Sequence, residues 1–561
     1  MKEVDPCTAT TTYSSAVTVT GSAKYTRREF ESSYLGATGT AKAIRFAEIR
    51  VTDAVGSVVQ CSQTDSSGDF SFQLPLNNQT YLVSVNSRGL NSSLKASVLN
   101  NPTDNQFYSL STSVVADQDR SVGTLTAEGD SADVLGGAFN ILDVIVRANE
   151  FLRDKVGSCS GYTGCAAFTV ADKVSVFWGK GVNPATYVGG SASTGLSFYL
   201  PGRSQLYILG GIGGDVDNTD TDHFDDSVIA HEYGHFIEDL YAETDSPGGA
   251  HDANSIIDPR LAWGEGWANF FSLAVNGSST YRDSFGNVSG TSRGYYFNHN
   301  LENTTRDYNS GGTSGEGNFR EFAVTRALWD LMDAPADASF PGMSNEASGP
   351  PTGNNLYTPS LEDGVQGNFA ELWAIFSNSF KSSTYAFRDY GLFMYLYSNF
   401  NSPSLTGMAG IYTAEKQKNT RADYAAGYTL SGTDCGSVSI SSTVPSGSSG
   451  YGSAAAAANQ FYRNDFYLVD HPGGVMSLAL SWTGGQDLDL YVYGEGYTYG
   501  SSSSVVAKSD RVNGTVTPPV DYSESVSQAI AAGKYLVNVN LWSGSGTASY
   551  KLQLGGQYVC P

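Results

Sequence analysis

Short runs of alternating apolar and polar residues dominate the first part of the chain. Residues 1–30 are rich in Thr and Ser and lack strong periodicity. Period-two runs follow between Gly, Asn and Asp turns, at Ile44–Asp53, Ser57–Gln63, Phe70–Leu74 and Tyr81–Asn86. Such alternation is typical of strands that bury one face. The pattern predicts an N-terminal arm or first strand at 1–30 and a small β-sandwich at 31–125.

The periodicity changes to three and four residues near Ala138, which predicts a helix through Leu152. Strand-like runs then occur at Lys173–Trp178, Leu196–Leu200 and Gln205–Leu209. A helix is expected to begin at Asp225, and further helices are expected at Gly264–Val275, Phe319–Met332, Phe369–Phe380 and Asp389–Phe400. Residues 126–435 therefore form an α+β domain in which the sheet precedes the helices.

The last quarter of the chain returns to short strands after a segment rich in Ser, Gly and Ala. Residues 436–457 have too few apolar side chains to bury and are predicted to be a linker. The strand-like runs are Met476–Trp482, Leu488–Tyr493, Tyr535–Leu541 and Tyr550–Leu554. They predict a second all-β sandwich at 458–561, so the fold class is multidomain, an α+β domain flanked by two all-β sandwich modules.

The net charge of -24 excludes a nucleic-acid partner, because phosphate binding needs clustered Lys and Arg. One acidic segment has two open interpretations, a solvated loop or a structural Ca²⁺ site built from hard oxygen ligands. Its carboxylates are Asp215, Asp217, Asp220, Asp222, Asp225 and Asp226.

Cysteine usage points to an oxidising compartment. The six cysteines form no C-x-x-C pair and allow complete disulfide pairing. Domain locality favours three bridges: Cys7–Cys61, Cys159–Cys165 and Cys435–Cys560. No apolar run approaches the roughly 20 residues needed to cross a bilayer. We expect a secreted monomer without a transmembrane segment, whose export signal is absent from this chain and has been removed.

The chemistry is concentrated in His231-Glu232-Tyr233-Gly234-His235, which matches H-E-x-x-H inside an apolar helical pattern. Histidines four residues apart share one helix face, so both imidazoles can reach one Zn²⁺ ion while Glu232 acts on its water. Catalytic zinc needs a third protein ligand, and the best candidate is Glu265 in the next apolar helix. A helix N-terminal glutamate stabilised by the helix dipole is the alternative for Glu265.

These two motifs resemble the gluzincin, or thermolysin-like, metallopeptidases. Gly264-Glu265-Gly266-Trp267 is most similar to the fungalysin family, and Arg326-Ala327-Leu328-Trp329-Asp330 loosely resembles a later helix of such enzymes. The resemblance covers roughly residues 130–430. It implies a zincin-type catalytic domain, zinc held by His231, His235 and Glu265, and Glu232 as general base in the hydrolysis of protein or peptide substrates.

The resemblance also implies supporting roles that this sequence meets only in part. Gluzincins usually carry an Asp four residues after the glutamate ligand to orient a zinc histidine, and here the residue is Asn269. The oxyanion donor is expected among His251, His299, Tyr295, Tyr296 and Tyr308; His299 and Tyr308 lie downstream of Glu265, where gluzincins often place this donor. Ordinary packing is the alternative for each. The strand Gln205–Leu209 resembles the edge strand on which these enzymes align an extended substrate.

The flanking modules carry resemblances of their own. Thr64–Phe70 and Tyr81–Val85 resemble the carboxypeptidase-regulatory-like, transthyretin-like sandwiches of secreted proteins. Asp487–Val492 and Gly533–Val539 resemble the bacterial pre-peptidase C-terminal domain. Both imply accessory domains without chemistry.

The sequence predicts a secreted zinc endopeptidase, and two other readings stay open. One is a zinc exopeptidase or a protease directed at glycosylated proteins, because the same ligands serve those reactions. The other is an adhesive surface protein in which a degenerate peptidase domain is only a scaffold. An intact set of buried ionisable groups argues against the scaffold.

Overall fold

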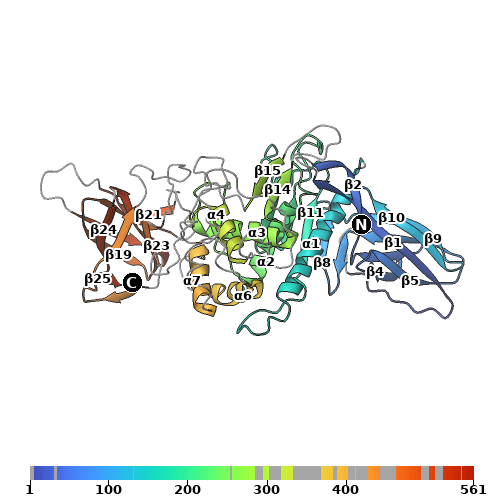
Figure 1. Ribbon diagram of the computed structural model, residues 1–561, viewed down its shortest axis with the longest axis horizontal. Helices are drawn as coiled ribbons and strands as arrows, with labels where there is room; N and C mark the ends of the chain where they lie inside the picture. The colour runs from blue at the N-terminus through green and yellow to red at the C-terminus, as the bar shows by residue number, and fades with distance from the viewer. Residues whose placement is uncertain are drawn as a thin grey trace. The chain divides into compact units, whose positions relative to one another are not determined.

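The computed structural model describes residues 6–30, 35–130, 132–252, 255–284, 295–301, 317–332, 368–382, 388–401, 411, 428–442, 461, 463–494, 504–511, 522–544 and 546–560. The chain divides into two compact units. The first contains residues 1–161, 166–240 and 271–300, and the second contains 162–165, 241–270 and 301–561. Strands predominate among the described residues, and most of the helices lie between two strand-rich regions of the chain (Figure 1).

The first unit begins with two four-stranded sheets. One has the order β10-β1-β2, and β5 pairs antiparallel with the N-terminal part of β1. Its strands are β1 (Ala16–Phe30), β2 (Leu35–Ala43), β5 (Asp69–Pro75) and β10 (Arg120–Ala127). The other has the order β4-β3-β6-β9, from β3 (Glu48–Thr52), β4 (Val58–Gln63), β6 (Thr80–Asn86) and β9 (Ser109–Val115). The predicted arm therefore ends in a 15-residue strand whose Val17, Val19 and Tyr25 are buried.

A five-stranded sheet of order β12-β13-β11-β8-β7 follows in the same unit. Its strands are β7 (Arg88–Leu90), β8 (Lys95–Leu99), β11 (Val174–Trp178), β12 (Phe198–Leu200) and β13 (Gln205–Ile208). A short 3-10 helix, η1 (Pro184–Val188), lies between β11 and β12. The prediction that Gln205–Leu209 is an edge strand is wrong, because β12 pairs antiparallel with β13 and takes the edge itself.

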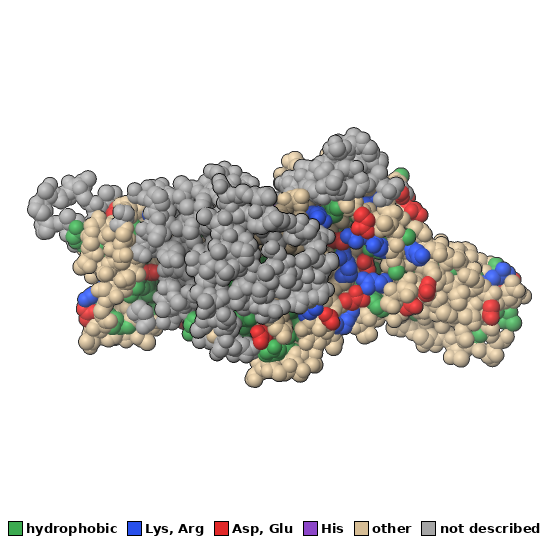
Figure 2. Space-filling view, in the orientation of Figure 1, with side chains coloured by type: hydrophobic (Ala, Val, Ile, Leu, Met, Phe, Trp, Pro, Cys, Tyr) green, Lys and Arg blue, Asp and Glu red, His purple; other side chains and the backbone are tan. Residues whose placement is uncertain are grey.

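Helix α1 (Gly136–Lys155) contacts β1, β8 and β10 through an apolar face that includes Phe139, Ile145 and Leu152. Its polar side carries carboxylates that bind Arg45, whose Nε lies 2.8 Å from Asp143 and whose Nη1 lies 2.7 Å from Glu150. Basic and acidic side chains intermingle on the face of the first unit seen in Figure 2.

The helices that follow have the bounds expected from their apolar spacing to within a few residues. They are α2 (Asp226–Tyr241), α3 (Pro259–Asn276), α4 (Glu321–Met332), α6 (Phe369–Ala374) and α7 (Tyr390–Asn401). A π-helical segment, η2 (Ile375–Phe380), continues α6. The strands β14 (Thr280–Ser284) and β15 (Tyr295–Asn300) form an antiparallel pair after α3.

Two further sheets share one apolar core in the second unit. One has the order β16-β25-β24-β19-β22 with β17 on β24, from β16 (Thr429–Ser431), β17 (Val438–Ser442), β19 (Gly474–Thr483), β22 (Ser523–Ile530), β24 (Gly546–Leu554) and β25 (Gln557–Cys560). The other has the order β18-β23-β20-β21, from β18 (Asn464–His471), β20 (Asp487–Tyr493), β21 (Val505–Ser509) and β23 (Gly533–Ser543). Part of the predicted linker is strand instead, because Ile440 of β17 is 2% exposed in this core.

All six cysteines are disulfide-bonded. Two bridges are Cys7–Cys61 and Cys435–Cys560, as predicted from domain locality, and the remaining cysteines are Cys159 and Cys165. None of the helices in the described part of the chain is both long and apolar enough to span a bilayer. The predominance of sandwich-like sheets agrees with the predicted fold class, while the zincin-type assignment of the middle region stays a prediction.

Candidate metal centre

Helix α2 presents the H-E-x-x-H residues from a well anchored N-terminus. Asp226, its first residue, accepts hydrogen bonds from Arg27 at 2.6 Å, from Asn140 at 3.0 Å and from Arg147. Burial alone would raise the pKa of Asp226, but the charges of Arg147 and Arg27 hold this pKa below its usual value. A charged carboxylate at a helix N-terminus also interacts favourably with the helix dipole. The helix therefore starts at a fixed point one turn before His231.

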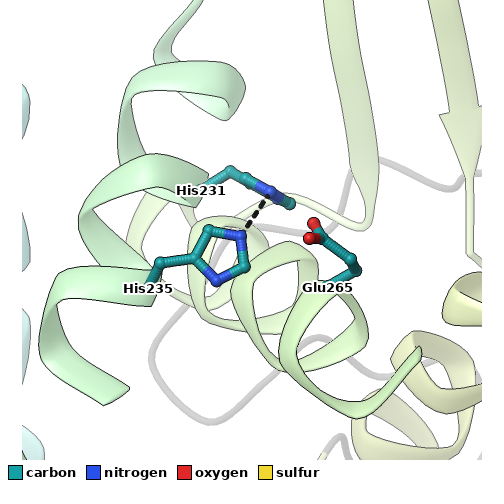
Figure 3. Close-up of side chains that lie close together, drawn as sticks. All are labelled: His231, His235 and Glu265. Atoms are coloured by element: carbon teal, nitrogen blue, oxygen red, sulfur yellow. Dashed lines mark hydrogen bonds between the residues drawn. The ribbon is translucent and has the colours of Figure 1, made fainter. Parts of the chain in front are cut away.

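Three candidate ligands converge beyond this point. His231 Nε2 and His235 Nε2 are 3.1 Å apart, and one atom of each lies within 4.8 Å of a carboxylate oxygen of Glu265. In Figure 3 the two imidazole rings project from one side of α2 toward the carboxylate of Glu265 on α3.

The donor set fits zinc. Two nitrogens bound tetrahedrally at about 2.0–2.1 Å from one ion are about 3.3–3.4 Å apart, close to the observed separation. Two imidazoles and one carboxylate also form the ligand set of several zinc hydrolases, which leave a fourth position open. His231 is 8% exposed and Glu265 9%, so both side chains are largely removed from solvent. A buried carboxylate is costly unless it is paired or binds a metal.

Besides Glu265, groups from their own helix and from β14 lie near the two histidines. Glu232, adjacent to His231 on α2, is 6% exposed. Glu238 Oε2 lies 4.0 Å from His235 Nδ1. The ring of Tyr281 on β14 stands edge-on to His231, with 6.1 Å between centroids. These neighbours restrict the rotation of both imidazole rings.

A second group meets the candidate ligand Glu265 from the other side. His251 Nδ1 lies 2.7 Å from Glu321 Oε2, and His251 Nε2 lies 3.5 Å from Glu265 Oε1. Glu321 is the first residue of α4 and is 5% exposed. Sequence reasoning included His251 only among five oxyanion donors and did not identify Glu321. The one available signal was an acidic residue at the start of an apolar helix.

The other predicted site residues are distributed as follows. His299 is 7% exposed on β15, opposite Tyr281 of β14. Tyr295 and Tyr296 belong to the same strand, and Tyr308 lies outside the described residues. Asn269 is 3% exposed on α3, one turn after Glu265.

The predicted acidic loop separates into groups with different surroundings. Asp215 accepts hydrogen bonds at 2.8 Å from the backbone of Asp217 and Asn218, which makes it a turn residue. Asp226 is neutralised by arginines. Asp220 and Asp222 instead lie with Asp283 of β14, one carboxylate oxygen of each within 4.8 Å of the others.

Comparison with known proteins matches residues 201–373 to the family model of the Mycolysin C-terminal domain. No curated protein matches the chain. Among solved structures, the pre-peptidase C-terminal domain of a collagenase from Bacillus anthracis is 14% identical over 21% of this chain and 89% of that one, with a TM-score of 0.14. PliG from Aeromonas hydrophila, a periplasmic inhibitor of g-type lysozyme, is 15% identical over 16% of this chain and 75% of that one, with a TM-score of 0.12.

The family match covers the segment that contains both α2 and α3. It supports a secreted, protease-associated context for the chain, and the disulfides agree with that context, because such bridges persist in oxidising compartments.

Proposed function

We propose that this chain is a secreted zinc-dependent endopeptidase of gluzincin type, nearest to the fungalysins. One observation carries the proposal: donor atoms of His231, His235 and Glu265 lie within 4.8 Å of one another. The mixed nitrogen and oxygen donors favour zinc over calcium or magnesium, which prefer all-oxygen sites. The match to the Mycolysin C-terminal domain adds support from outside the geometry.

The chain's own residues have separate tasks in this proposal. Bound zinc would supply Lewis acidity toward the peptide carbonyl and a water molecule. Glu232 accepts the proton of the attacking water and delivers it to the leaving amine nitrogen. Its burial beside the two histidines keeps the carboxylate close to where that water must lie. No covalent intermediate with the protein forms.

His251 is the best-placed donor for the developing oxyanion. Its Nδ1 is held by Glu321 at 2.7 Å, so its Nε2 edge is directed toward Glu265. A carboxylate bonded to Nδ1 fixes the ring orientation and keeps a proton on that nitrogen. Nε2 can donate to the oxyanion only when the ring carries a second proton as imidazolium, a form that carboxylates beside both nitrogens stabilise. Its side chain is 32% exposed, which leaves it accessible to a bound peptide. His299 and Tyr308 remain the donors proposed from the family resemblance.

The substrate is proposed to lie along β12, the edge of the five-stranded sheet. Tyr199 of this strand packs against Phe236 of α2, with 6.0 Å between ring centroids, and hydrogen-bonds to Asp239. These contacts hold β12 against α2, the helix that carries His231 and His235. Free backbone groups at a sheet edge can pair with an extended peptide.

The test is metal analysis joined to proteolysis. We expect about one zinc ion per chain, loss of casein hydrolysis on chelation, and recovery when zinc is restored. A chain that binds no zinc, or that cleaves casein equally well after complete removal of metal, contradicts the proposal.

Peptide substrates separate the related activities. An endopeptidase cleaves long peptides whose two ends are blocked, whereas an exopeptidase requires a free end. Cleavage restricted to O-glycosylated peptides would instead favour a glycoprotein-directed protease. Adhesion to a surface without any hydrolysis would favour the scaffold alternative.

A further inference from the structure

A second group of carboxylates, none of them a candidate zinc ligand, belongs entirely to the first unit. Asp220 and Asp222 come from the loop before α2, and Asp283 comes from β14. One oxygen of each lies within 4.8 Å of the others. Two oxygens bound to one calcium ion at about 2.4 Å are at most about 4.8 Å apart, so the three can reach a common ion.

The charges of this group are not balanced by arginine or lysine. Among the described residues, no ion pair within 4.0 Å involves Asp220, Asp222 or Asp283, whereas nearby Asp226 binds two arginines. Burial, reinforced by the neighbouring carboxylates, raises the pKa of both Asp222 and Asp283 well above the usual value. Like charges held this closely in the interior are unfavourable unless protons or a cation neutralise them.

Unsatisfied oxygen atoms are the independent sign of a missing partner. Asp222 is 3% exposed; Ser197 donates to its Oδ2, while its Oδ1 has no hydrogen-bond partner within the described ranges. The Oδ1 atoms of Asp220 and Asp283 are likewise buried and unpartnered in that part of the chain. The hydroxyl of Thr221, which is 1% exposed, shares this condition. Buried polar atoms normally have partners, so several together indicate an absent ligand.

We propose that Asp220, Asp222 and Asp283 bind one Ca²⁺ ion. The oxygen-only donor set is the kind that calcium prefers, and calcium accepts variable coordination more readily than magnesium, which demands a near-ideal octahedron. The ion would join the loop before α2 to the strand after α3. Asp225 strengthens the same connection, because its Oδ2 accepts a hydrogen bond at 2.6 Å from the backbone of Ser284.

The proposal differs from a simpler arrangement in which two carboxyl groups share a proton. Asp220 and Asp283 are close enough for that, since a hydrogen bond between them contributes to the pKa of each. A shared proton leaves the protein insensitive to calcium. Calcium binding stabilises the folded state in proportion to the logarithm of the free ion concentration. Calcium titration therefore distinguishes the two arrangements.

The experiment uses the full chain carrying Glu232→Gln, which prevents self-digestion. The protein is stripped of metal, reloaded with one equivalent of zinc and titrated with CaCl₂ by calorimetry and thermal unfolding. We expect the parent to bind one more Ca²⁺ per chain than Asp283→Asn, with a calcium-dependent rise in unfolding temperature of about 4 °C or more at saturation. Asp283→Asn should lose that rise, and without calcium it should unfold no earlier than the parent.

Asp217→Asn is the matched control, because Asp217 is an exposed carboxylate in the same loop. It should retain the calcium stoichiometry and the temperature shift. If Asp283→Asn does not fold, Asp220→Asn is measured in its place with the same expectation. Equal stoichiometry in parent and variant, no calcium response in the parent, or tighter binding of Mg²⁺ than of Ca²⁺ would each overturn the proposal. None of these readings depends on peptidase activity.

Discussion

Glu232 is a buried glutamate whose helix position brings it next to the two candidate zinc histidines but leaves it outside the ligand set. It is 6% exposed, and it contributes to the raised pKa of Asp222 through charge repulsion. Glutamine has nearly the same shape as glutamate without the charge. Its chemistry can therefore be tested separately from its packing.

Glu232→Gln should retain zinc and lose activity. The amide cannot accept a proton from water, so we expect kcat to fall by about 10²- to 10⁴-fold while zinc per chain stays at the parental value. Casein hydrolysis and metal content are measured on the same preparation. Glu243→Gln is the control, since Glu243 is an exposed glutamate just beyond α2. Parental activity in the Glu232 variant would contradict the assigned role.

Asn269 tests how the environment of the ligands tunes zinc affinity. It is buried on α3 one turn after Glu265, where the resembling enzymes carry an aspartate that orients a zinc histidine. A negative charge there would raise the basicity of the ligand, so Asn269→Asp should lower the zinc dissociation constant by about 10-fold. Competition with a chromogenic chelator measures it. An unchanged constant would argue against contact between this position and a ligand.

The sequence identified the site residues that are recognisable from their position within a single helix. His231 and His235 share a face because of helix geometry alone, and Glu265 stood out as a charge inside an apolar helix. Glu321 and Asp283 were missed because each meets its partners through tertiary contacts. Spacing along the chain contains no information on which strand or helix will face a given loop.

At the scale of elements, the close packing of α3 against α4 depends on Gly266. A Cβ atom at this position would lie 2.6 Å from Cβ and Cγ1 of Val324 and 2.9 Å from the backbone oxygen of Glu321. Helix atoms cannot give way at such distances without moving the helices apart. The glycine beside Glu265 thus lets the helix that carries Glu321 approach, which brings Glu321 to His251.

Gly266→Ala should therefore disturb both stability and the site. Overpacking of this kind costs about 1–3 kcal/mol, which exceeds the gain of about 1 kcal/mol expected from replacing a helical glycine by alanine. We expect earlier unfolding in urea and weaker zinc binding. Adding Val324→Ala should restore part of the loss by removing the Cγ1 contact. A variant as stable as the parent would show that α3 and α4 are not held this closely.

Helices and buried strands were predictable where one face is apolar over several turns or residues, as in α1 and β19. Other elements were predicted only in part or not at all, for physical reasons. β1 has a Thr-rich exposed side, which hides the buried alternation of Val17 and Val19. β17 has only Val438 and Ile440 to indicate a strand within Ser-rich sequence. β12 was expected as a strand at Leu196–Leu200, but nothing in the spacing indicates that it pairs with β13 and takes the sheet edge.

At the scale of the whole molecule, a disulfide and a strand pairing link distant parts of the sequence within the second-unit sandwich. Cys435 and Cys560 are joined across a separation of 125 residues, and the chain end β25 pairs with β16. Closing so long a loop removes conformational entropy from the unfolded chain and is expected to contribute about 4 to 5 kcal/mol in the entropic account. The sandwich can therefore accommodate unfavourable buried charge, and Asp489 is one example.

Burial raises the pKa of Asp489 on β20 to about 7, although Tyr491 donates a hydrogen bond to it; Asp487 adds repulsion. In the unfolded chain an aspartate titrates near about 3.9. The folded sandwich thus binds this proton more tightly than the unfolded chain does. Protonation of Asp489 therefore favours folding. Its contribution to the free energy of unfolding is absent well above pH 7, grows as pH falls through about 7, and is complete below about pH 4.

We therefore expect the unfolding transition of this sandwich to move to higher temperature between pH 8 and pH 5. Asp489→Asn resembles the protonated form, so it should be more stable than the parent at pH 8 and should lose most of the pH dependence in that interval. Scanning calorimetry of the full chain follows the transition. Asp470→Asn on β18, an exposed aspartate of the same sandwich, should keep the parental slope. Equal slopes in the parent and the Asp489 variant would show that another group controls this response.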